Sequence, residues 1–490
     1  MSTSPQTIRE FIELLRDRNE LITIEKEASA RLEIPALAER MMKEPNGGKA
    51  MLFTHVEGSS QPLAVNLFGS FERLKLAFGV DDLAAIPARI RSLFDIVKMR
   101  GGLSNMLSLI GEAKDLLALP PKKVNGGYAQ EVVHTKEASL DTLPILHCWE
   151  GDGGPFITLP MVITKSPKDG TYNIGMYRMQ KFDARTTGMH WHRHKVGARH
   201  YREHQEMGIQ KMPVCVALGG SPALVYASTA PLPPQIDEYA FTGFLRSENV
   251  RVTKAVTNDL LIPADCEIIL EGYVDTTEPL RREGPFGDHT GYYSLADDYP
   301  VFHLEAITSC KKPIYPATVV GVPPMEDYYL GYMTERIFLP VIQMMLPEIV
   351  NYSMPSWGVF HNFVFVSIKK EFPSHAKKVI YGLWGLGMMM LTKVIVVVDS
   401  DVDVENDREA LWVMLNNIDP KRDLVFGEGP LDELDHAAPR AAVGGKLGVD
   451  ATRKWKNEAD VREYPDKLAR GDAFMNALRK KWSDSGVFPK

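Results

Sequence analysis

The chain has 490 residues, which exceeds one ordinary hydrophobic core and predicts two to four domains. Its hydrophobic fraction of 44% and charged fraction of 24% are ordinary for a folded, soluble protein. The formal net charge of −7 and the lack of a basic block argue against a general nucleic-acid or anionic-membrane surface, so we expect no nucleic-acid partner. The 4 cysteines are widely spaced without a CxxC pair, which is typical of buried thiols in a reducing compartment.

Neither the beginning of the chain nor its long apolar run has the pattern of an export signal or a membrane span. The start, MSTSPQTIREFIELLRD, is polar and then amphipathic, unlike a signal peptide. The run YGLWGLGMMMLTKVIVVVDSD is interrupted by Lys393 and ends in β-branched residues. It therefore predicts a buried helix followed by a buried strand. We expect a cytoplasmic protein without stable membrane insertion.

Residues 1–117 predict a compact N-terminal α/β module. Apolar residues at helical spacing predict helices over 7–21, 32–44 and 70–80, and strand patterns occupy 21–25, 50–56 and 63–69. A stretch rich in Pro, Gly and Lys, Leu117–Gly127, predicts a linker.

Over residues 128–314 the sequence pattern changes to many short strands separated by turn residues. This pattern favours a β-barrel or a β-sandwich. The expected strands cover 160–166, 171–182, 213–220, 223–229, 266–274 and 301–309. From 315 to 449 the pattern alternates again, with strands at 359–370 and 393–401 and helices at 374–391 and 407–417. The charged end, 450–490, predicts a helical arm that packs on a neighbouring subunit. The fold class is therefore α/β (α+β).

Two acidic residues flank a Gly/Pro-rich loop, REGPFGDHTGYY. Glu283 and Asp288 are close enough in sequence for their pKa values to be pushed apart, so that one keeps a proton. Arg178, in a predicted strand, could clamp a carboxylate bidentately. The alternatives are a polar turn with an Asx cap at Asp288 and a surface arginine.

The stretch GMHWHRHK has three histidines in alternation, which in a strand would place the imidazoles on one face. A three-histidine metal cage, a proton-handling site and unrelated side chains all remain open. A mixed set of Asn173, His194 and Glu238 would suit Mn²⁺ or Mg²⁺ better than structural zinc. The sequence has no P-loop, no GxGxxG after a strand and no GxSxG, which argues against Rossmann-type nucleotide enzymes and serine hydrolases.

Several long motifs then occur in order: NIGMYR, HWHRHK, DEYAFTG, EGPFGDHTGYY, PPMEDYYLG, KVIVVVDSDVD and GGKLGVDATRKW. With them the chain resembles the UbiD family of reversible decarboxylases, which use prenylated FMN, over nearly its whole length. The resemblance implies an N-terminal α/β module, a central flavin-binding split β-barrel and a C-terminal α/β domain with an oligomerising helical tail. It also implies a homodimer or homohexamer and a flavin prenyltransferase that supplies the cofactor.

The resemblance implies a site for each part of the cofactor. Mn²⁺ (or Mg²⁺), held by Asn173, His194 and Glu238, would bridge to the flavin phosphate, and K⁺ (or Na⁺) would lie at the carbonyls of Ala227 and Ser228. Lys393 matches a lysine that reaches the phosphate. The remaining residues expected to line the flavin are Ile174, Met176, Tyr177, Arg178, His190, Trp191, His192 and Lys195.

The catalytic trio implied by the family is Arg178, Glu283 and Asp288. Arg178 would orient the substrate carboxylate, Glu283 would fix Arg178, and Asp288, with a pKa raised by burial, would donate a proton as CO₂ leaves. The GDH triplet resembles the ubiquinone-pathway and aromatic-acid members, which act on hydroxybenzoates or other aryl acids, whereas ferulic-acid-type members carry Glu at the last position. The histidine-rich HWHRHK departs from the ubiquinone-pathway enzyme.

We therefore expect decarboxylation of an aromatic carboxylic acid, with hydroxylated and polycyclic acids among the candidates. Three alternatives stay open: a 3-polyprenyl-4-hydroxybenzoate decarboxylase of ubiquinone-type biosynthesis, a non-catalytic flavin- or metal-binding subunit, and a metal-dependent hydrolase built on the histidines.

Overall fold

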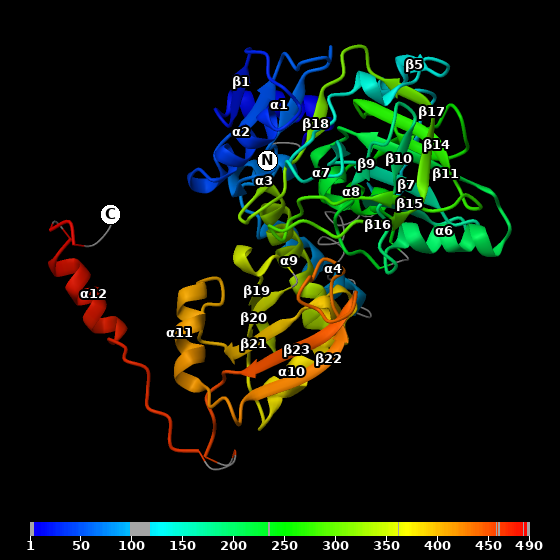
Figure 1. The fold of residues 1–490 in the computed structure, drawn as a ribbon. Helices are drawn as coiled ribbons and strands as arrows, with labels where there is room; N and C mark the ends of the chain where they lie inside the picture. The colour runs from blue at the N-terminus through cyan, green and yellow to red at the C-terminus, as the bar shows by residue number, and fades with distance from the viewer. Residues whose placement is uncertain are drawn as a thin grey trace.

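The computed structural model describes residues 4–98, 118–233, 236–360, 362–456, 458, 461–483 and 485–487. The N-terminal and central parts of the chain lie side by side, and the C-terminal α/β part lies below them in the view of Figure 1. The end of the expected N-terminal module, residues 99–117, falls outside the described residues. No helix of the described chain is long and apolar enough to cross a membrane.

The N-terminal part is a mixed sheet in the order β1-β2-β3-β18, covered by helices. Helix α1 begins where the Thr7 side chain accepts a hydrogen bond from the Glu10 N–H, and its buried residues recur at helical spacing. The last strand of this sheet comes from far along the chain, so the polypeptide returns to the N-terminal sheet before it enters the C-terminal part. The elements are β1 (Leu21–Ile24), β2 (Ala50–Phe53), β3 (Leu63–Val65), β18 (Tyr315–Ala317), α1 (Ile8–Asp17), α2 (Glu33–Met42), α3 (Phe71–Phe78) and α4 (Ala85–Lys98).

The central part is built on an antiparallel sheet in the order β10-β17-β14-β11-β7-β8, with β5 beside β17. One of its buried faces packs with α1, α3, α7 and α8 in a shared core. The strands are β5 (Val132–His134), β7 (Met161–Lys165), β8 (Tyr172–Met176), β10 (Thr186–Gly188), β11 (Lys211–Leu218), β14 (Ile268–Asp275) and β17 (Val301–Ser309). The helices are α6 (Val196–Glu206), α7 (Pro222–Ala227) and α8 (Glu238–Arg246).

Short strands at the margins of the central sheet shape the loops that carry the predicted site. The pairs are β6 with β9, β15 with β16, and β12 between β4 and β13. Their bounds are β4 (Lys122–Lys123), β6 (Phe156–Ile157), β9 (Met179–Gln180), β12 (Arg251–Lys254), β13 (Leu261–Pro263), β15 (Arg281–Glu283) and β16 (Asp297–Tyr299).

The C-terminal part is a sheet in the order β19-β20-β21-β23-β22, with the central pairings parallel and the outer ones antiparallel. Helix α10 covers one face and α11 covers the other, each with its own apolar core. The strands are β19 (Ile349–Ser353), β20 (Phe363–Ile368), β21 (Val394–Asp399), β22 (Leu424–Pro430) and β23 (Val443–Asp450). The helices are α9 (Glu326–Met345), which joins this part to the rest, α10 (His375–Trp384) and α11 (Asp407–Asn417).

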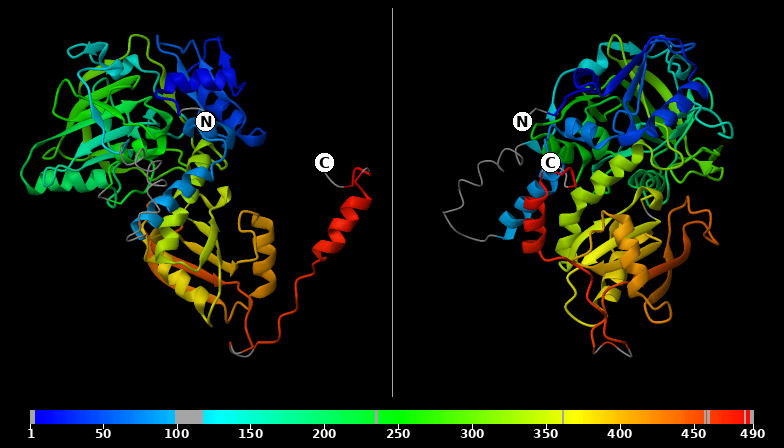
Figure 2. Two further views of the ribbon diagram at one scale, coloured as in Figure 1. Left: turned by 180° about the vertical axis from the view of Figure 1, so that it is seen from behind. Right: turned by 90° about the vertical axis from the view of Figure 1, so that its left-hand side faces the viewer.

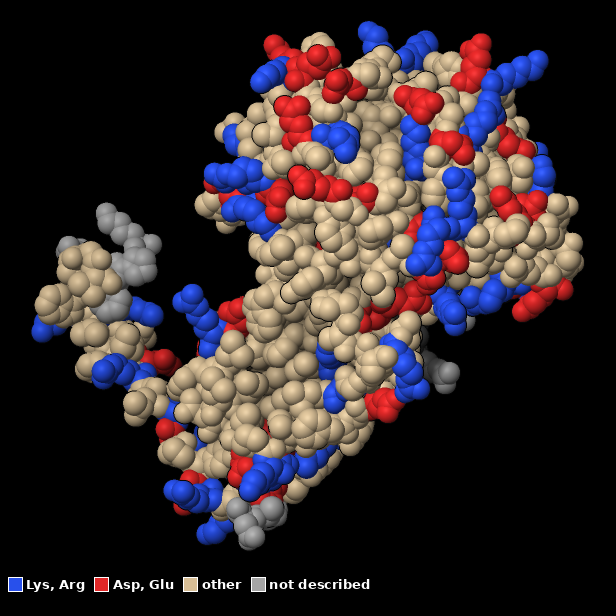
Figure 3. Space-filling view, in the orientation of Figure 1, with Lys and Arg blue, Asp and Glu red and all other residues tan. Residues whose placement is uncertain are grey.

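The chain ends in helix α12 (Asp472–Lys481), which stands apart from the body of the molecule at the end of an extended segment (Figure 2). None of the residues of this helix is buried. Only this part of the expected tail is helical among the described residues, so the helix expected over the charged end is shorter than the pattern suggested. On the face drawn in Figure 3, the described Lys and Arg side chains are interspersed with Asp and Glu.

Three sequence predictions about local structure are wrong. Residues 223–229 were expected as a strand but lie largely in α7, because Ser221 caps the helix through the Leu224 N–H and Pro222 occupies its first position. All residues of α7 are buried, so its sequence lacks the alternation of apolar and polar faces by which a helix is recognised. The HWHRHK stretch is a loop between β10 and α6, and the helix expected over 374–391 ends at Trp384.

Candidate functional site

Arg178 lies in the short break between β8 and β9 rather than within a strand, which turns its side chain into the protein interior. Its guanidinium, with the side chain 8% exposed, is shared between two carboxylates. Nε donates to Glu283 Oε1 at 3.1 Å and Nη2 donates to Oε2 of the same residue at 3.3 Å. Nη1 pairs with Asp288 Oδ2. The three predicted catalytic residues therefore form one continuous ionic cluster.

The loop that carries Glu283 and Asp288 is fixed from two sides. Ser294 Oγ accepts from Arg178 Nη2 at 3.0 Å and from the Phe286 N–H at 3.2 Å. The buried Asp152 accepts from the Gly287 N–H at 2.7 Å through Oδ1, and from two backbone N–H groups of its own loop through Oδ2. Sequence reasoning missed both residues: Asp152 lies far from the motif in sequence, and Ser294 directly follows the motif but is a lone serine without a signal of its own.

Both carboxyl groups are ionised in this arrangement. Burial alone would raise the pKa of Asp288, but the charge of Arg178 and the hydrogen bond from His289 hold it well below its usual range. Burial likewise opposes the ionised form of Glu283, yet the hydrogen bond from His190 and the charge of Arg178 lower its pKa. The raised pKa predicted for Asp288 is therefore wrong for the state that the structure describes, because both of its oxygens are already occupied by donors.

Two of the histidines in the loop extend the ionic cluster. His190 Nδ1 lies 3.0 Å from Glu283 Oε2, and His190 Nε2 lies 2.6 Å from His192 Nε2. Burial is the main reason that the pKa values of both imidazoles are lowered, which favours their neutral forms. If His190 donates through Nδ1 to Glu283, its Nε2 must accept the proton of His192 Nε2. The imidazoles meet although the strand predicted for them is absent, since the loop folds back on itself.

Two of the three predicted metal ligands lie close together. Glu238, the first residue of α8, accepts the N–H of Ile174, the neighbour of Asn173, at 2.7 Å. Burial raises the pKa of Glu238 to about 8, so its ionised form is disfavoured in the protein alone. A cation bound beside this carboxylate would stabilise the ionised form. The amide of Asn173 is buried and its Nδ2 lies 3.4 Å from Tyr177 Oη. These two residues fit a hard divalent ion.

His194, the third predicted ligand, is exposed and its ring centroid lies 5.8 Å from that of His192. His192, His194 and Glu433 offer ligand atoms that lie within 4.8 Å of one another. Glu433 comes from the loop after β22, so this second group joins the central and C-terminal parts. The set of Asn173, His194 and Glu238 stays a prediction.

The residues predicted to line a flavin gather around the same loop. Tyr177 and Trp191 are buried against each other with ring centroids 6.5 Å apart, and burial raises the pKa of Tyr177 to about 12. Trp191 Nε1 is a buried donor without a hydrogen-bond acceptor in the described chain, which fits an acceptor brought by a ligand. Burial lowers the pKa of Lys195, against the attraction of Asp432 and Glu433.

The other predicted cofactor positions are occupied by internal contacts. In β8, Ile174 is buried and the Met176 N–H donates to the Ser228 carbonyl at 2.9 Å. The Ala227 carbonyl accepts from the Ala230 N–H at 3.2 Å, and each of these carbonyl oxygens keeps a second lone pair for a cation. Lys393 Nζ, just before β21, pairs with Asp435 Oδ2 at 2.8 Å. This lysine therefore faces the same acidic loop, after β22, that approaches His192.

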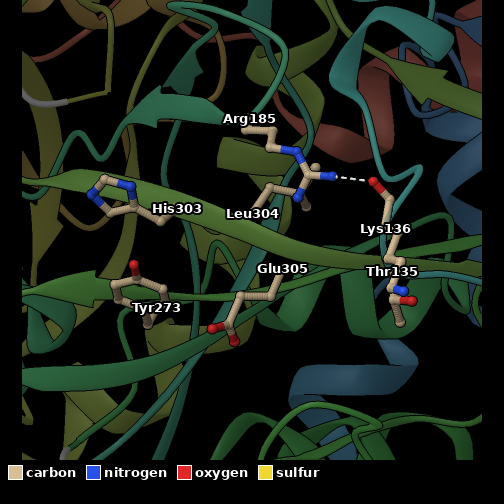
Figure 4. Close-up of a pocket in the computed structure, with 7 residues that line it drawn as sticks. All are labelled: Thr135, Lys136, Arg185, Tyr273, His303, Leu304 and Glu305. Carbon is tan, nitrogen blue, oxygen red and sulfur yellow. Dashed lines mark hydrogen bonds between the residues drawn. The ribbon is translucent and has the colours of Figure 1, made fainter.

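An open hollow of about 500 Å³ lies elsewhere, on the outer side of the central sheet (Figure 4). In it Arg185 Nη2 donates to the Lys136 carbonyl at 2.5 Å. None of the predicted site residues lines it. Its lining residues are Thr135, Lys136, Arg185, Tyr273, His303, Leu304 and Glu305.

Comparisons with known proteins place the chain in a family. Three domain profiles of 3-octaprenyl-4-hydroxybenzoate carboxy-lyase, or UbiD, match it: the N-terminal domain over residues 12–92, the Rift-related domain over 122–323 and the C-terminal domain over 328–451. The chain is 50% identical over 482 residues to an uncharacterized protein of Archaeoglobus fulgidus, a match that covers 97% of this chain and 98% of that protein.

Solved structures give the same fold. The vanillic acid decarboxylase of Sedimentibacter hydroxybenzoicus in its closed form is 23% identical with a TM-score of 0.86, covering 99% of this chain and 100% of that chain. The UbiD-class enzyme HmfF from Pelotomaculum thermopropionicum in complex with FMN is 23% identical with a TM-score of 0.77, covering 94% and 97%. These matches confirm the resemblance read from the motifs, and the chain belongs to the UbiD family of carboxy-lyases.

Proposed function

We propose that this chain catalyses the reversible, non-oxidative decarboxylation of an aromatic carboxylic acid with prenylated FMN as cofactor. The observation that carries the proposal is the buried guanidinium of Arg178, held on one side by Glu283 and on the other by Asp288. A buried arginine with one side fixed and one side exchangeable is suited to bind and orient a carboxylate.

The substrate carboxylate takes the place of Asp288 at Nη1 of Arg178. Glu283 keeps its two contacts with Nε and Nη2, so the guanidinium plane does not move. Asp288 then loses the positive charge that lowers its pKa and becomes able to hold a proton, because burial favours its neutral form. It delivers this proton to the carbon that has lost CO₂.

When bound, prenylated FMN would supply an electron sink for the decarboxylation. We assign its lining to Ile174, Met176, Tyr177, Arg178, His190, Trp191, His192 and Lys195, and its phosphate to Lys393. The unpaired donor of Trp191 supports a ligand with acceptor atoms at this place. Asn173, His194 and Glu238 would hold Mn²⁺ or Mg²⁺ beside the phosphate, and the carbonyls of Ala227 and Ser228 would hold K⁺ or Na⁺.

The rest of the assembly follows the family. The central sheet is proposed to act as the split barrel that receives the flavin, and a flavin prenyltransferase would supply the cofactor. Helix α12, whose residues are not buried, supports a homodimer or homohexamer in which the tail packs on another subunit.

An aryl acid is favoured over a polyprenyl substrate by the histidine-rich loop. His192 lies against His190 at the edge of the ionic cluster, where a polar substituent of an aromatic ring could reach it. The relative of similar fold that acts on vanillic acid is in keeping with this substrate class.

The test is to produce the chain together with a flavin prenyltransferase and to incubate it with a panel of aryl and α,β-unsaturated acids. We expect a flavin absorbance in the purified protein and CO₂ release from at least one aryl acid. Arg178→Met should bind the flavin and release no CO₂. A flavin-loaded protein that turns over none of the acids would contradict the proposal, as would full activity of the Arg178 variant.

A further inference from the structure

The proposed acid of the reaction, Asp288, faces hydrogen-bond donors with both of its carboxylate oxygens. Its Oδ2 faces the guanidinium of Arg178 and its Oδ1 accepts hydrogen bonds from His289, through Nδ1 at 3.0 Å and through the backbone N–H at 2.8 Å. Decarboxylation consumes one proton in each turnover, since a carboxylate becomes a C–H bond and CO₂. That proton must be stored on a neighbouring group.

We infer that His289 acts through Asp288: it stores this proton as an imidazolium and passes it through Nδ1 to Asp288 when a carboxylate ligand takes Arg178. The inference rests on the proposed function and assigns a role to a side chain in direct contact with the acid.

The surroundings of His289 favour its charged form. Burial alone would lower its pKa, but the hydrogen bond to Asp288 and the charges of Asp288, Asp327 and Asp432 raise it. These carboxylates come from three elements: the loop of Asp288 itself, the first turn of α9 and the loop after β22. The ring also packs against Phe360 with centroids 5.5 Å apart, which fixes its plane. The two other histidines of the network contact Glu283 and each other: His190 Nδ1 lies 3.0 Å from Glu283 Oε2 and His190 Nε2 lies 2.6 Å from His192 Nε2.

The transfer follows from the change at Arg178. A bound carboxylate neutralises the guanidinium and brings a further negative charge close to Asp288, so the pKa of Asp288 rises. Burial opposes a separated ion pair and favours a neutral carboxylic acid beside a neutral imidazole. The N–H bond at His289 Nδ1 breaks and an O–H bond forms at Asp288 Oδ1. The acid then protonates the product carbon, and His289 regains a proton from solvent before the next turnover.

A spectroscopic test needs no turnover. In protein labelled with ¹⁵N-histidine and loaded with flavin, His289 should titrate above the ordinary value of about 6.5. Asp288→Asn should lower this value. Benzoate, an aromatic carboxylate that can occupy Arg178, should shift the His289 Nδ1 signal toward the neutral imidazole at constant pH. A His289 that titrates at or below about 6.5, or that does not respond to benzoate, overturns the inference.

A kinetic test uses His289→Asn, which keeps a donor near Asp288 but cannot store a proton. With a substrate found in the acid panel, kcat should fall roughly a hundredfold and KM should change less than about threefold. The wild-type kcat should decline as pH rises through the pKa of His289, and the variant should lack this decline. His303→Asn is the matched control, because His303 pairs with Glu278 at 2.5 Å on the outer face of the sheet, and it should keep the wild-type kcat.

The possible outcomes separate this inference from the proposed function. An active wild type whose His289→Asn and His289→Gln variants keep full kcat and the same alkaline decline overturns the role of His289 and leaves the function intact. If the wild type is inactive on every acid but its His289 signal still shifts with benzoate, the proposed function is wrong and the proton exchange between His289 and Asp288 stands. If His289→Asn does not fold, His289→Gln and the spectra of the wild type still decide the question.

Discussion

Replacing Glu283 with Gln tests the central pair of the site most sharply. Glu283 is fully buried and receives three hydrogen bonds, from Arg178 Nε at 3.1 Å, from Arg178 Nη2 at 3.3 Å and from His190 Nδ1 at 3.0 Å. A glutamine can accept from Nε through its oxygen, but its NH₂ group then faces two donors. Two charge-assisted hydrogen bonds are lost, each of about 1.5–3 kcal/mol.

Part of this loss is recovered when the side chains relax, so we expect about 3 kcal/mol less stabilisation of the transition state. That corresponds to a fall in kcat of roughly 150-fold, because each 1.4 kcal/mol is a factor of ten. The flavin does not depend on this carboxylate, so its absorbance in the purified variant should stay close to that of the wild type.

The assay is CO₂ release at saturating substrate, with the flavin absorbance measured on the same sample. Glu278→Gln is the matched control, since it also removes a histidine-paired glutamate but on the outer face of the central sheet. If the kcat of the Glu283→Gln enzyme stayed within threefold of the wild-type value, the hydrogen bonds of Glu283 would not contribute to stabilisation of the transition state. Loss of flavin from the variant would show that Glu283 holds the cofactor in place and does not act by positioning Arg178.

Three further predictions concern the metal, the pH dependence and the support of the catalytic loop. His194→Ala should lose the divalent metal and the flavin together, measured by elemental analysis and absorbance, whereas His192→Ala should keep both and change kcat or the preferred acid; retained metal in the first variant would exclude His194 as a ligand. Burial raises the pKa of Glu335 to about 7, so the folded protein keeps a proton that the unfolded chain releases above its own lower pKa. The contribution of this group to the unfolding free energy is greatest at acid pH and declines as pH rises through about 7. The unfolding free energy, measured with urea, should therefore fall less between pH 5 and pH 8 for Glu335→Gln than for the wild type. An equal fall in both proteins would contradict the raised pKa of Glu335. Asp152→Asn should lower the unfolding free energy by about 1–3 kcal/mol and lower kcat, because one backbone donor, such as the Gly287 N–H, loses its charged acceptor; unchanged kcat would separate this aspartate from the position of Asp288.

Much of the fold could be predicted from the sequence because its elements are strongly patterned. Helix α1 and strand β21 lie where apolar spacing and β-branched runs predicted them. Residue periodicity gave the wrong secondary structure where an element is buried on all sides, and where a loop happens to alternate in residue type with the period of a strand. Helix α7 is buried on all sides and gave no period, and the alternating histidines occur in a loop whose course depends on contacts with Glu283.

The candidate site was predicted at its centre and missed at its edges. Arg178, Glu283 and Asp288 stand in motifs, and the structure brings them into contact. Asp152 and Ser294 act through hydrogen bonds that only tertiary structure creates, so no local pattern reveals them. The pKa of Asp288 was predicted in the wrong direction, since burial was considered without the opposing charge of Arg178.

Release of ¹³CO₂ from a carboxyl-labelled aryl acid by the flavin-loaded protein in the absence of oxygen is the most direct test of the proposed decarboxylation. We expect one ¹³CO₂ for each molecule of decarboxylated product, without any added oxidant. We also expect incorporation of one solvent deuterium at the carbon that lost the carboxyl group. Activity that needs no flavin, or the absence of ¹³CO₂ from every labelled acid, would contradict it.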